Sequence, residues 1–373
     1  MSGKHDDFDS VVRSKFTVRD VFQLSEGEAE YRVDYGPGAA SNFSDLLRAV
    51  APLGMTARLV GSSDGATLFV KKKQPMPDTR SRVPVILALL TMTSTVVFAI
   101  FERTIFEEFA PGFQGEAVLV IYAAAIILLL LFHEVGHRYT AGRLNASSPT
   151  PYFIPGIPGL TSFLPALGIA ARQREPSTNR DLLFDVMIVG PLLAFLLAII
   201  LYVIGGFFSV QSSTPLQGHQ LVNPFISVSE INPSVIQAGL DYLIGPLIPN
   251  VAPGFVRLSP LQDAATVGFL LTVVGLLPLA SFDGGHLSSL SWGTKGSRVA
   301  TYASVFALIA LDTPNYWALA IVVLLVAGRP AEPQLLDEVS PLSKSRGWIY
   351  LVGLFVALLS LPIPQNVATF PLG

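Results

Sequence analysis

The stretch His133-Glu134-Val135-Gly136-His137 directly continues an uncharged apolar run, Ala117 to Phe132. Residues four apart share one face of a helix, so the imidazoles of His133 and His137 can bind the same metal ion. Glu134 lies beside them and can act as a base toward water bound to that ion. Because an ionisable group at membrane depth is costly, the sequence predicts a functional metal site inside a membrane helix.

The His-Glu-x-x-His spacing is typical of zinc peptidases, which carry it on a helix. The chain has only five His in 373 residues, so a chance occurrence of the pattern is rare. The alternative interpretation is a helix end at which His133 and Glu134 simply meet interfacial water. That alternative needs no metal and no chemistry.

The composition indicates a polytopic membrane protein. Hydrophobic residues make up 51% of the chain, charged residues 14%, and the mean hydropathy is +0.54. The formal net charge of −3 gives no sign of a nucleic-acid partner. The absence of Cys excludes disulfides, thiolate zinc sites and Cys catalysis. The first 80 residues lack an apolar core of the signal-peptide kind, so no cleaved signal is expected.

Residues 1–82 differ from the rest of the chain and hold 12 of its 24 Lys and Arg. They are predicted to form a small soluble α+β domain and a basic linker, Lys71 to Arg82. The expected elements are a helix over Asn42–Val50, capped by Ser41 or Asn42, a turn at Ser63-Asp64-Gly65, and strands over Glu30–Tyr35, Met55–Val60 and Ala66–Val70. Their function is not readable, and a folded cytosolic appendage is the favoured interpretation.

Residues 83–373 are predicted to form a transmembrane metalloprotease domain, an all-α bundle. Its uncharged apolar runs are Val83–Phe101, Ala117–Phe132, Val186–Val210, Ala264–Phe282, Val299–Leu311, Tyr316–Gly328 and Trp348–Ile363. A membrane-spanning helix needs about 20 apolar residues. The fifth and sixth runs are shorter and could be half-helices or one hairpin, so the expected number of transmembrane helices is about six to seven.

The distribution of basic residues predicts the orientation in a cell membrane. If the N-terminal domain is cytoplasmic, the outside loops hold only Arg103 and Arg257. The inside segments after the first span then hold ten: Arg138, Arg143, Arg172, Arg174, Arg180, Lys295, Arg298, Arg329, Lys344 and Arg346. This bias predicts a multi-pass protein with His133 near the cytoplasmic end of its second span and its last residues outside.

The segment between the second and third spans is not a simple loop. Pro151 to Pro158 is apolar but rich in proline, and Leu167 to Ala171 could pair with it as a strand. We therefore expect a membrane-dipping, β-hairpin-like segment, which is tolerated at that depth only against protein or a water-filled cavity. Its strand edge could pair with an extended substrate. A purely structural hairpin is an equally good interpretation.

Two histidines do not complete a catalytic zinc site, which takes three protein ligands and leaves one position open. His5 lies in the soluble part and His219 in a long outside loop. Asp283 and His286 lie at the cytoplasmic end of the fourth span, at the expected depth of His133. Pro278 should break that helix, and Gly284 and Gly285 should let the backbone turn, so that Asp283 can point into the bundle.

Together these motifs resemble the site-2 protease family of intramembrane metalloproteases. That family pairs His-Glu-x-x-His with a later Asn-x-x-Pro-x-x-x-x-Asp-Gly, which reads here from Gly275 through Pro278 to Asp283-Gly284. Gly190-Pro191-Leu192 also matches a family feature. The Pro151-to-Pro155 stretch and the soluble N-terminal domain look most like the archaeal, cyanobacterial and chloroplast branch. The resemblance covers most of residues 83–298.

The resemblance implies the roles of the site residues. It makes His133, His137 and Asp283 the ligands of Zn²⁺ and Glu134 the catalytic acid/base. For His286, one turn past Asp283, the favoured interpretation is a neighbour of the site or an interfacial residue, and a role as a ligand is the alternative. The family Asn is Gly275 here, and Gly has no side-chain donor with which to position a substrate or stabilise charge.

The function that this resemblance implies is intramembrane zinc endopeptidase. Its partners would be a transmembrane protein substrate and the lipid bilayer, with no nucleic acid, and the substrate helix would have to unwind locally. Gly275 motivates an alternative, a catalytically weak membrane chaperone or scaffold of the same family. A metal-dependent carrier is a third hypothesis, since buried His and Asp also bind transported ions, but no second half repeats the His motif.

Overall fold

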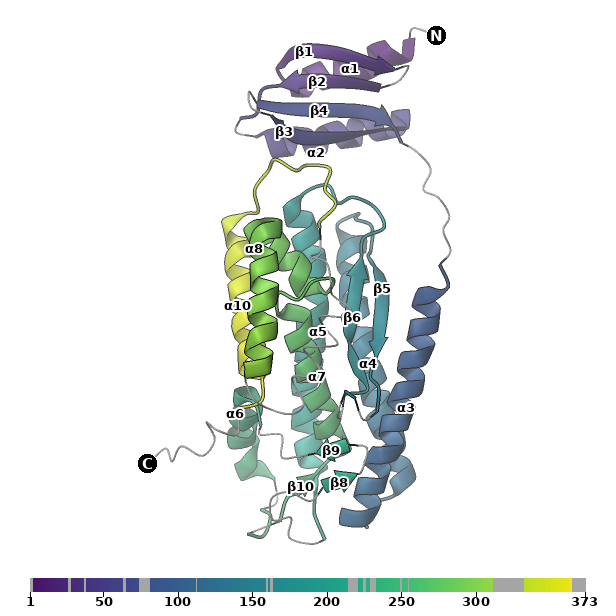
Figure 1. The fold of residues 1–373 in the computed structure, drawn as a ribbon, viewed down its shortest axis with the longest axis vertical. Coiled ribbons are helices and arrows are strands. Elements are labelled where there is room, and N and C mark those ends of the chain that lie inside the picture. The colour runs from purple at the N-terminus through teal and green to yellow at the C-terminus, as the bar shows by residue number, and fades with distance from the viewer. Residues whose placement is uncertain are drawn as a thin grey trace, which may run out of the picture.

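A small sheet domain stands on one end of a mostly helical bundle (Figure 1). The computed structural model describes residues 3–363 apart from 26–27, 37, 63–64, 74–80, 112, 159, 162–163, 214–220, 224–225, 229–232, 249, 254 and 311–331. The sheet domain comes from the first 73 residues, and the bundle from residue 83 onward.

The N-terminal domain is a four-stranded antiparallel sheet with two helices on one face (Figure 1). Its elements are α1 (Gly3–Lys15), β1 (Val18–Ser25), β2 (Glu28–Val33), α2 (Ala39–Val50), the 3₁₀ turn η1 (Ala51–Leu53), β3 (Met55–Ser62) and β4 (Gly65–Lys72). The strand order is β1-β2-β4-β3. Alternate side chains of β2, β3 and β4 are buried, as one covered face of a sheet requires.

The three predicted strands of this domain are present, but the helix begins differently from the prediction. Neither Ser41 nor Asn42 caps it: the helix starts at Ala39 after Gly38, whose φ of 88° turns the chain into the first turn. The Ser41 hydroxyl instead donates to the Gly38 carbonyl at 2.7 Å. Helix α1 and strand β1 were not predicted, and residues 63–64 of the predicted turn lie outside the described residues.

Three helices of the bundle are long and apolar enough to cross a membrane: α3 (Val83–Phe109), α4 (Gly115–Arg143) and α5 (Arg180–Phe207). The remaining helices are α6 (Val235–Ile244) with the 3₁₀ turn η2 (Gly245–Leu247), α7 (Pro260–Leu276), α8 (Asp283–Ala310, kinked at Gly293) and α10 (Lys344–Ser360). Four short strands, at the end away from the N-terminal domain, are β7 (Val210–Gln211), β8 (Leu221–Asn223), β9 (Ile226–Val228) and β10 (Arg257–Leu258).

The expected count of six to seven spans is not confirmed, because only α3, α4 and α5 meet the length and hydropathy of a span among the described residues. The predicted run Ala264–Phe282 is helical only to Leu276, and its last six residues form a connection. The run Val299–Leu311 falls in the second half of α8, and Tyr316–Gly328 lies outside the described residues.

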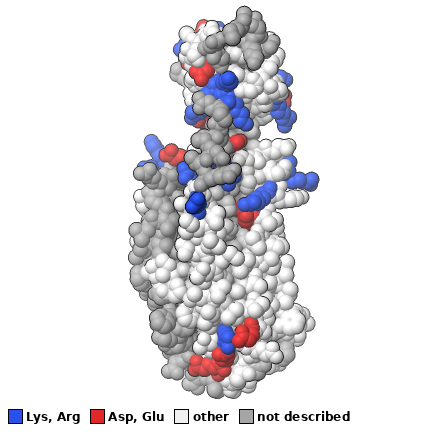
Figure 2. All heavy atoms as spheres, turned by 90° about the vertical axis from the view of Figure 1, so that its right-hand side faces the viewer, with Lys and Arg blue, Asp and Glu red and all other residues white. Residues whose placement is uncertain are grey.

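Charged side chains are distributed as a membrane protein requires. Figure 2 shows a broad band without Lys, Arg, Asp or Glu between a charged upper region and a charged patch at the lower end. At the ends of α3 and α4 that lie away from the N-terminal domain, Arg103 forms ion pairs with Glu107 and Glu116 at 2.7 and 2.9 Å. The uncharged band is the part of the surface that a bilayer would cover.

The proline-rich segment forms an antiparallel hairpin, β5 (Thr150–Pro155) and β6 (Ala166–Arg172). The hairpin lies between α3 and α7 (Figure 1). The far edge of β6 is occupied over two residues by the chain itself: Ala170 bridges Phe282, and the Ala171 amide donates to the Ser281 carbonyl at 3.1 Å. At those two residues the edge is not open to an incoming strand, which favours the structural interpretation of this part of the hairpin.

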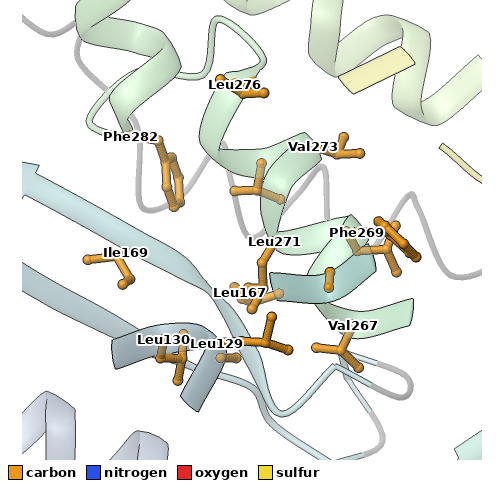
Figure 3. Close-up of a cluster of buried hydrophobic side chains, with 14 of the residues drawn as sticks. Leu129, Leu130, Leu167, Ile169, Val267, Phe269, Leu271, Val273, Leu276 and Phe282 are labelled. Carbon is orange, nitrogen blue, oxygen red and sulfur yellow. The ribbon is translucent and has the colours of Figure 1, made fainter. Parts of the chain in front are cut away.

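The core beneath this hairpin includes side chains of α4, β6 and α7 (Figure 3). Leu129 and Leu130 come from α4, Leu167 and Ile169 from β6, and the facing side chains from α7. Phe282 is buried in the same cluster and directly precedes Asp283. This packing fixes the end of the α7–α8 connection against β6.

An ion-pair cluster fastens α10 to the start of α5, and its loss should destabilise the bundle. Arg346 binds Asp185 through two nitrogens, at 2.7 and 2.6 Å, and Asp181 at 2.8 Å. We expect Arg346→Gln to cost about 1–3 kcal/mol, because two carboxylates lose a charged donor. Thermal unfolding in detergent should show a lower midpoint. The exposed Lys344, two residues away, supplies the control Lys344→Gln, and equal midpoints for both variants would contradict the prediction.

Candidate metal centre

Helix α4 places the His-Glu-x-x-His motif inside the bundle. His133, Glu134 and His137 are 5%, 7% and 1% exposed. Val135 and Tyr139 lie on the opposite face and are more than half exposed. The periodicity of the helix thus directs the three functional side chains to one buried face. This is not a helix end at which polar groups meet water, because α4 continues to Arg143.

Asp283 reaches the same place from the connection between α7 and α8. Helix α7 ends at Leu276, and Pro278 follows in a non-helical stretch that ends with Ser281 at a φ of 71°. Asp283 is the first residue of α8 and is fully buried. Gly284 and Gly285 are helical; a Cβ at either position would overlap backbone of the connection itself. The two glycines therefore allow the connection to pack closely on α8. The backbone turn that was predicted at Gly284 and Gly285 lies instead before Asp283.

Three potential ligands converge. The distance from Asp283 Oδ2 to His133 Nε2 is 2.8 Å, and to His137 Nε2 it is 3.4 Å. One ligand atom from each residue lies within 4.8 Å of the other two. Of the residues described, these are the three that form such a group. Ligands at about 2.0–2.2 Å from one tetrahedral ion lie roughly 3.3 Å apart, so only small shifts are needed to hold one.

The unsatisfied atoms of the site also fit a metal ion. His137 Nε2 and Asp283 Oδ1 are buried and have no hydrogen-bond partner among the described residues. Buried polar atoms are normally paired, so two unpaired acceptor atoms within one group of potential ligands suit a bound cation. Two imidazole nitrogens and a carboxylate oxygen are ligands that zinc accepts, with a fourth position left for water or substrate.

Two features of α5 hold His137 in place. His137 Nδ1 lies 2.7 Å from the Val186 carbonyl oxygen, so Nδ1 carries the proton and Nε2 is free to face the site. Gly190 leaves room for the ring, because a Cβ there would lie 2.6 Å from His137 Cε1. Gly136 of α4 also lies close to Gly190, because a Cβ added at Gly136 would lie 2.9 Å from the Gly190 Cα. The two helices therefore approach through glycines beside the ligand.

The ion pair between Glu134 and Arg138 was missed by the sequence analysis. Arg138 Nε donates to Glu134 Oε1 at 2.5 Å. The side chain of Arg138 is largely exposed, whereas that of Glu134 is 9% exposed. The sequence does carry a signal for this ion pair, because a Glu and an Arg four residues apart on a helix are neighbours. The Val186 carbonyl carries no such signal, because every residue has one.

The other candidate residues are not members of the group of three potential ligands. His286 Nε2 donates to the Ala171 carbonyl at 3.0 Å, which ties α8 to β6, and His286 is not in the ligand group. Gly275 faces the site: a Cβ there would lie 3.6 Å from His133 Cε1. His5 is in α1, and His219 lies outside the described residues.

The family model described as Peptidase family M50 matches residues 121–311, which include both motifs and half of the chain. A probable zinc metalloprotease, EGY2 of the chloroplast of Arabidopsis thaliana, is 27% identical over 249 residues, 65% of this chain. The chloroplastic EGY1 proteins of Oryza sativa subsp. japonica and Arabidopsis thaliana, also named probable zinc metalloproteases, are 26% and 25% identical over 67% and 66% of this chain.

The matched part of the chain spans only about two fifths of these relatives, 41% of EGY2 and of the rice EGY1 and 43% of the Arabidopsis EGY1. No solved structure matches the chain at a significant level. The family model covers α4, the hairpin, α5, α7 and α8, which are the elements that bring the two His and the Asp together. The chain belongs to peptidase family M50, a family of zinc metalloproteases.

Proposed function

We propose that this protein is an intramembrane zinc endopeptidase that cleaves transmembrane segments of membrane proteins near the cytoplasmic side. The observation that carries the proposal is the convergence of His133, His137 and Asp283 at a buried point beside Glu134. Family membership supports the chemistry, and the three long apolar helices support a membrane setting. The substrate class rests on that setting.

Each residue of the site has its own role in the proposed reaction. His133, His137 and Asp283 would hold the zinc, with Val186 orienting the ring of His137. Zinc, when bound, acts as a Lewis acid that activates water and stabilises negative charge on the scissile carbonyl. Glu134 takes the proton of the attacking water and passes it to the leaving nitrogen. The backbone of an intact substrate helix is shielded by its own side chains, so the segment must unwind before Glu134 can act on it.

A chelator tests the proposal on the full chain in detergent. Zinc content and cleavage of a purified membrane-segment substrate are measured before chelation, after it, and after zinc is added back. We expect cleavage to stop with the loss of zinc and to return with it. Cleavage that persists in a zinc-free chain would remove the metal from the mechanism, and a chain that holds no zinc would contradict the proposal.

We further propose that residues 1–82 form a cytoplasmic domain that is dispensable for metal binding, and that six to seven spans follow. The excess of Lys and Arg on one side of the spans supports the orientation, and the ligands all lie outside the domain. The chain has no Cys, so a single introduced Cys reports its own position. We expect Arg48→Cys, on the exposed side of α2, to resist an impermeant thiol reagent in intact cells and to react after lysis. Labelling of intact cells would invert the topology.

Gly275 supports the alternative of a catalytically weak scaffold, and it can be tested directly. A Cβ at this position would lie 3.2 Å from Pro191 Cγ, so any side chain requires a small shift of that ring. We expect Gly275→Asn to cleave about tenfold faster than Gly275→Ala, because only Asn supplies a donor to developing charge. Both variants place a Cβ against Pro191, so a comparison of their rates removes the effect of that crowding. Equal rates in two folded, zinc-loaded variants would show that the enzyme positions its substrate without this donor.

A further inference from the structure

A short extended segment connects the N-terminal domain to the bundle. We call Glu332–Ser340 the strap; it precedes α10 and passes between the N-terminal sheet and the bundle (Figure 1). Its neighbouring residues Leu335 and Leu336 enter different cores. Leu335 is buried in the core of the bundle, and Leu336 packs against the core of the N-terminal domain. Successive side chains of an extended chain point in opposite directions, so one segment can couple two domains.

The strap is bonded to the edge strand of the N-terminal sheet. The Leu59 amide of β3 donates to the Leu336 carbonyl at 2.7 Å, and the Glu338 amide donates to the Leu59 carbonyl at 3.0 Å. Beside these bonds Arg58 forms an ion pair with Glu338, and the hydroxyls of Tyr35 and Ser340 lie 3.3 Å apart. A displacement of the sheet would therefore pull on the strap.

On its other side the strap is bonded to the segment that joins the hairpin to α5. The Leu336 amide donates to the Ser177 carbonyl at 2.8 Å, and the Ser177 amide donates to the Gln334 carbonyl at 2.9 Å. The Gln173 side chain, one residue past β6, both donates to and accepts from the backbone of Gln334. The strap is thus continuous, through hydrogen bonds, with the strand that lies beside the metal centre.

The strap also forms one wall of a hollow next to the ligands. This hollow has a volume of about 310 Å³, and its lining includes Tyr152, Arg172, Ser281, His286, Glu332 and Gln334. Ser281 and His286 lie on either side of Asp283 in the sequence. The hairpin and the start of α8 are fixed by the bridge between Ala170 and Phe282. The strap is the wall that is joined to the N-terminal domain.

The hollow is lined by three parts of the chain: the hairpin, the connection with the start of α8, and the strap. A polypeptide that approaches Asp283 through the hollow passes these three walls. A change in the position of the strap would therefore change the width of this approach.

We infer that the strap is a movable gate at the cytoplasmic mouth of the metal centre and that the N-terminal domain holds it closed. The inference rests on the proposed protease function and adds its regulation. Release of the strap from β3 widens the hollow beside Asp283, and docking of the strap onto β3 narrows it. A cytoplasmic signal that displaces the N-terminal domain would thereby activate cleavage at a site that it does not touch.

A reversible tether tests the gate. Because the chain has no native Cys, only the introduced pair can react with the thiol reagent. Arg58→Cys and Glu338→Cys are combined in the full chain and joined by a short bifunctional methanethiosulfonate, which a reductant removes. We expect the tether to lower cleavage at least fivefold, the reductant to restore it, and zinc content to stay unchanged. The control tether joins Arg32→Cys to Thr67→Cys, which face each other within the N-terminal sheet, and should have no effect.

The opposite change releases the strap. The double variant Arg58→Ala/Tyr35→Phe removes two polar side-chain contacts between the N-terminal domain and the strap, the ion pair with Glu338 and the hydroxyl contact with Ser340. We expect it to cleave at least twofold faster than the parent. Arg48→Ala removes an exposed Arg of the same domain whose ion pair is with Asp45; this variant is the control and should cleave at the parent rate. A drop in cleavage or no rise in the folded double variant would identify the contacts as merely structural and overturn the inference.

The outcomes distinguish a failure of the proposed gate from a failure of the proposed protease function. A zinc-loaded chain that cleaves equally well with and without a verified tether contradicts the gate and leaves the protease function standing. A chain that holds no zinc and cleaves nothing in any form contradicts the proposed function, and the gate with it.

Discussion

Replacing Glu134 with Gln is expected to lower cleavage at least about 100-fold while zinc content remains that of the parent. Gln keeps the volume of the side chain but does not accept the proton of the attacking water. The ligand atoms of His133, His137 and Asp283 lie within 4.8 Å of one another without any contribution from Glu134. Zinc content by elemental analysis and cleavage of a membrane-segment substrate measure the two effects separately.

Two controls isolate the lost base. Glu116→Gln changes an exposed Glu at the other end of the same helix and should leave cleavage unchanged. Arg138→Gln removes the partner that donates to Glu134 at 2.5 Å but keeps the carboxylate. If Arg138→Gln matched Glu134→Gln, the ion pair and not the base would be essential. If Glu134→Gln lost its zinc, Glu134 would be a ligand.

Replacing Gly190 with Ala is expected to lower the affinity for zinc about 10–100-fold, the range seen when support for a metal-bound His is lost. The new methyl group would lie 2.6 Å from His137 Cε1, so the ring must turn away from Asp283 or α5 must move back from α4. Either movement also strains the contact between His137 Nδ1 and the Val186 carbonyl, now 2.7 Å. Competition with a zinc-binding dye gives the affinity.

The matched control for this variant is Gly142→Ala, because a Cβ at Gly142 on α4 would meet nothing within 4 Å. It makes the same chemical change in a helix of the same bundle without touching a ligand. Equal zinc affinity for Gly190→Ala and the parent would show that α5 does not set the position of His137. A Gly190→Ala chain that fails to fold would appear in the thermal unfolding curve as a lowered midpoint, which Gly142→Ala should not share.

Local pattern was enough to predict how three of the candidate site residues lie relative to one another. His133, Glu134 and His137 share one helical face because the helix repeats every 3.6 residues, and that periodicity is a property of sequence spacing alone. Asp283 was reached by a resemblance between motifs, and its convergence with the histidines over 150 residues of separation required the folded chain. The alternation of β2 and β4 likewise marked strands, whereas exposed β1 carries no such alternation and was missed.

Contacts between backbones were not predictable in the same way. Three such contacts depend on which helices and strands become neighbours. They are the close approach of Gly136 to Gly190, the bond from His137 to the Val186 carbonyl, and the occupied edge of β6. The strap illustrates this most clearly, because a proline-bounded stretch of mixed composition gives no periodic signal. The cap of α2 was predicted wrongly for a related reason: Gly38 begins that helix through its backbone conformation, which two nearby polar side chains concealed.

The sequence by itself determined three features of this protein: a helix with the His-Glu-x-x-His spacing, a later Asp-Gly motif, and apolar runs long enough for a membrane. Such properties depend on residue type and on spacing within one element, which the chain carries before it folds. Only the tertiary structure decided how the ligands meet, which glycines make room for them, and how the N-terminal domain reaches the site through the strap. These depend on packing between segments far apart in the chain, where a few tenths of an ångström separate a contact from an overlap.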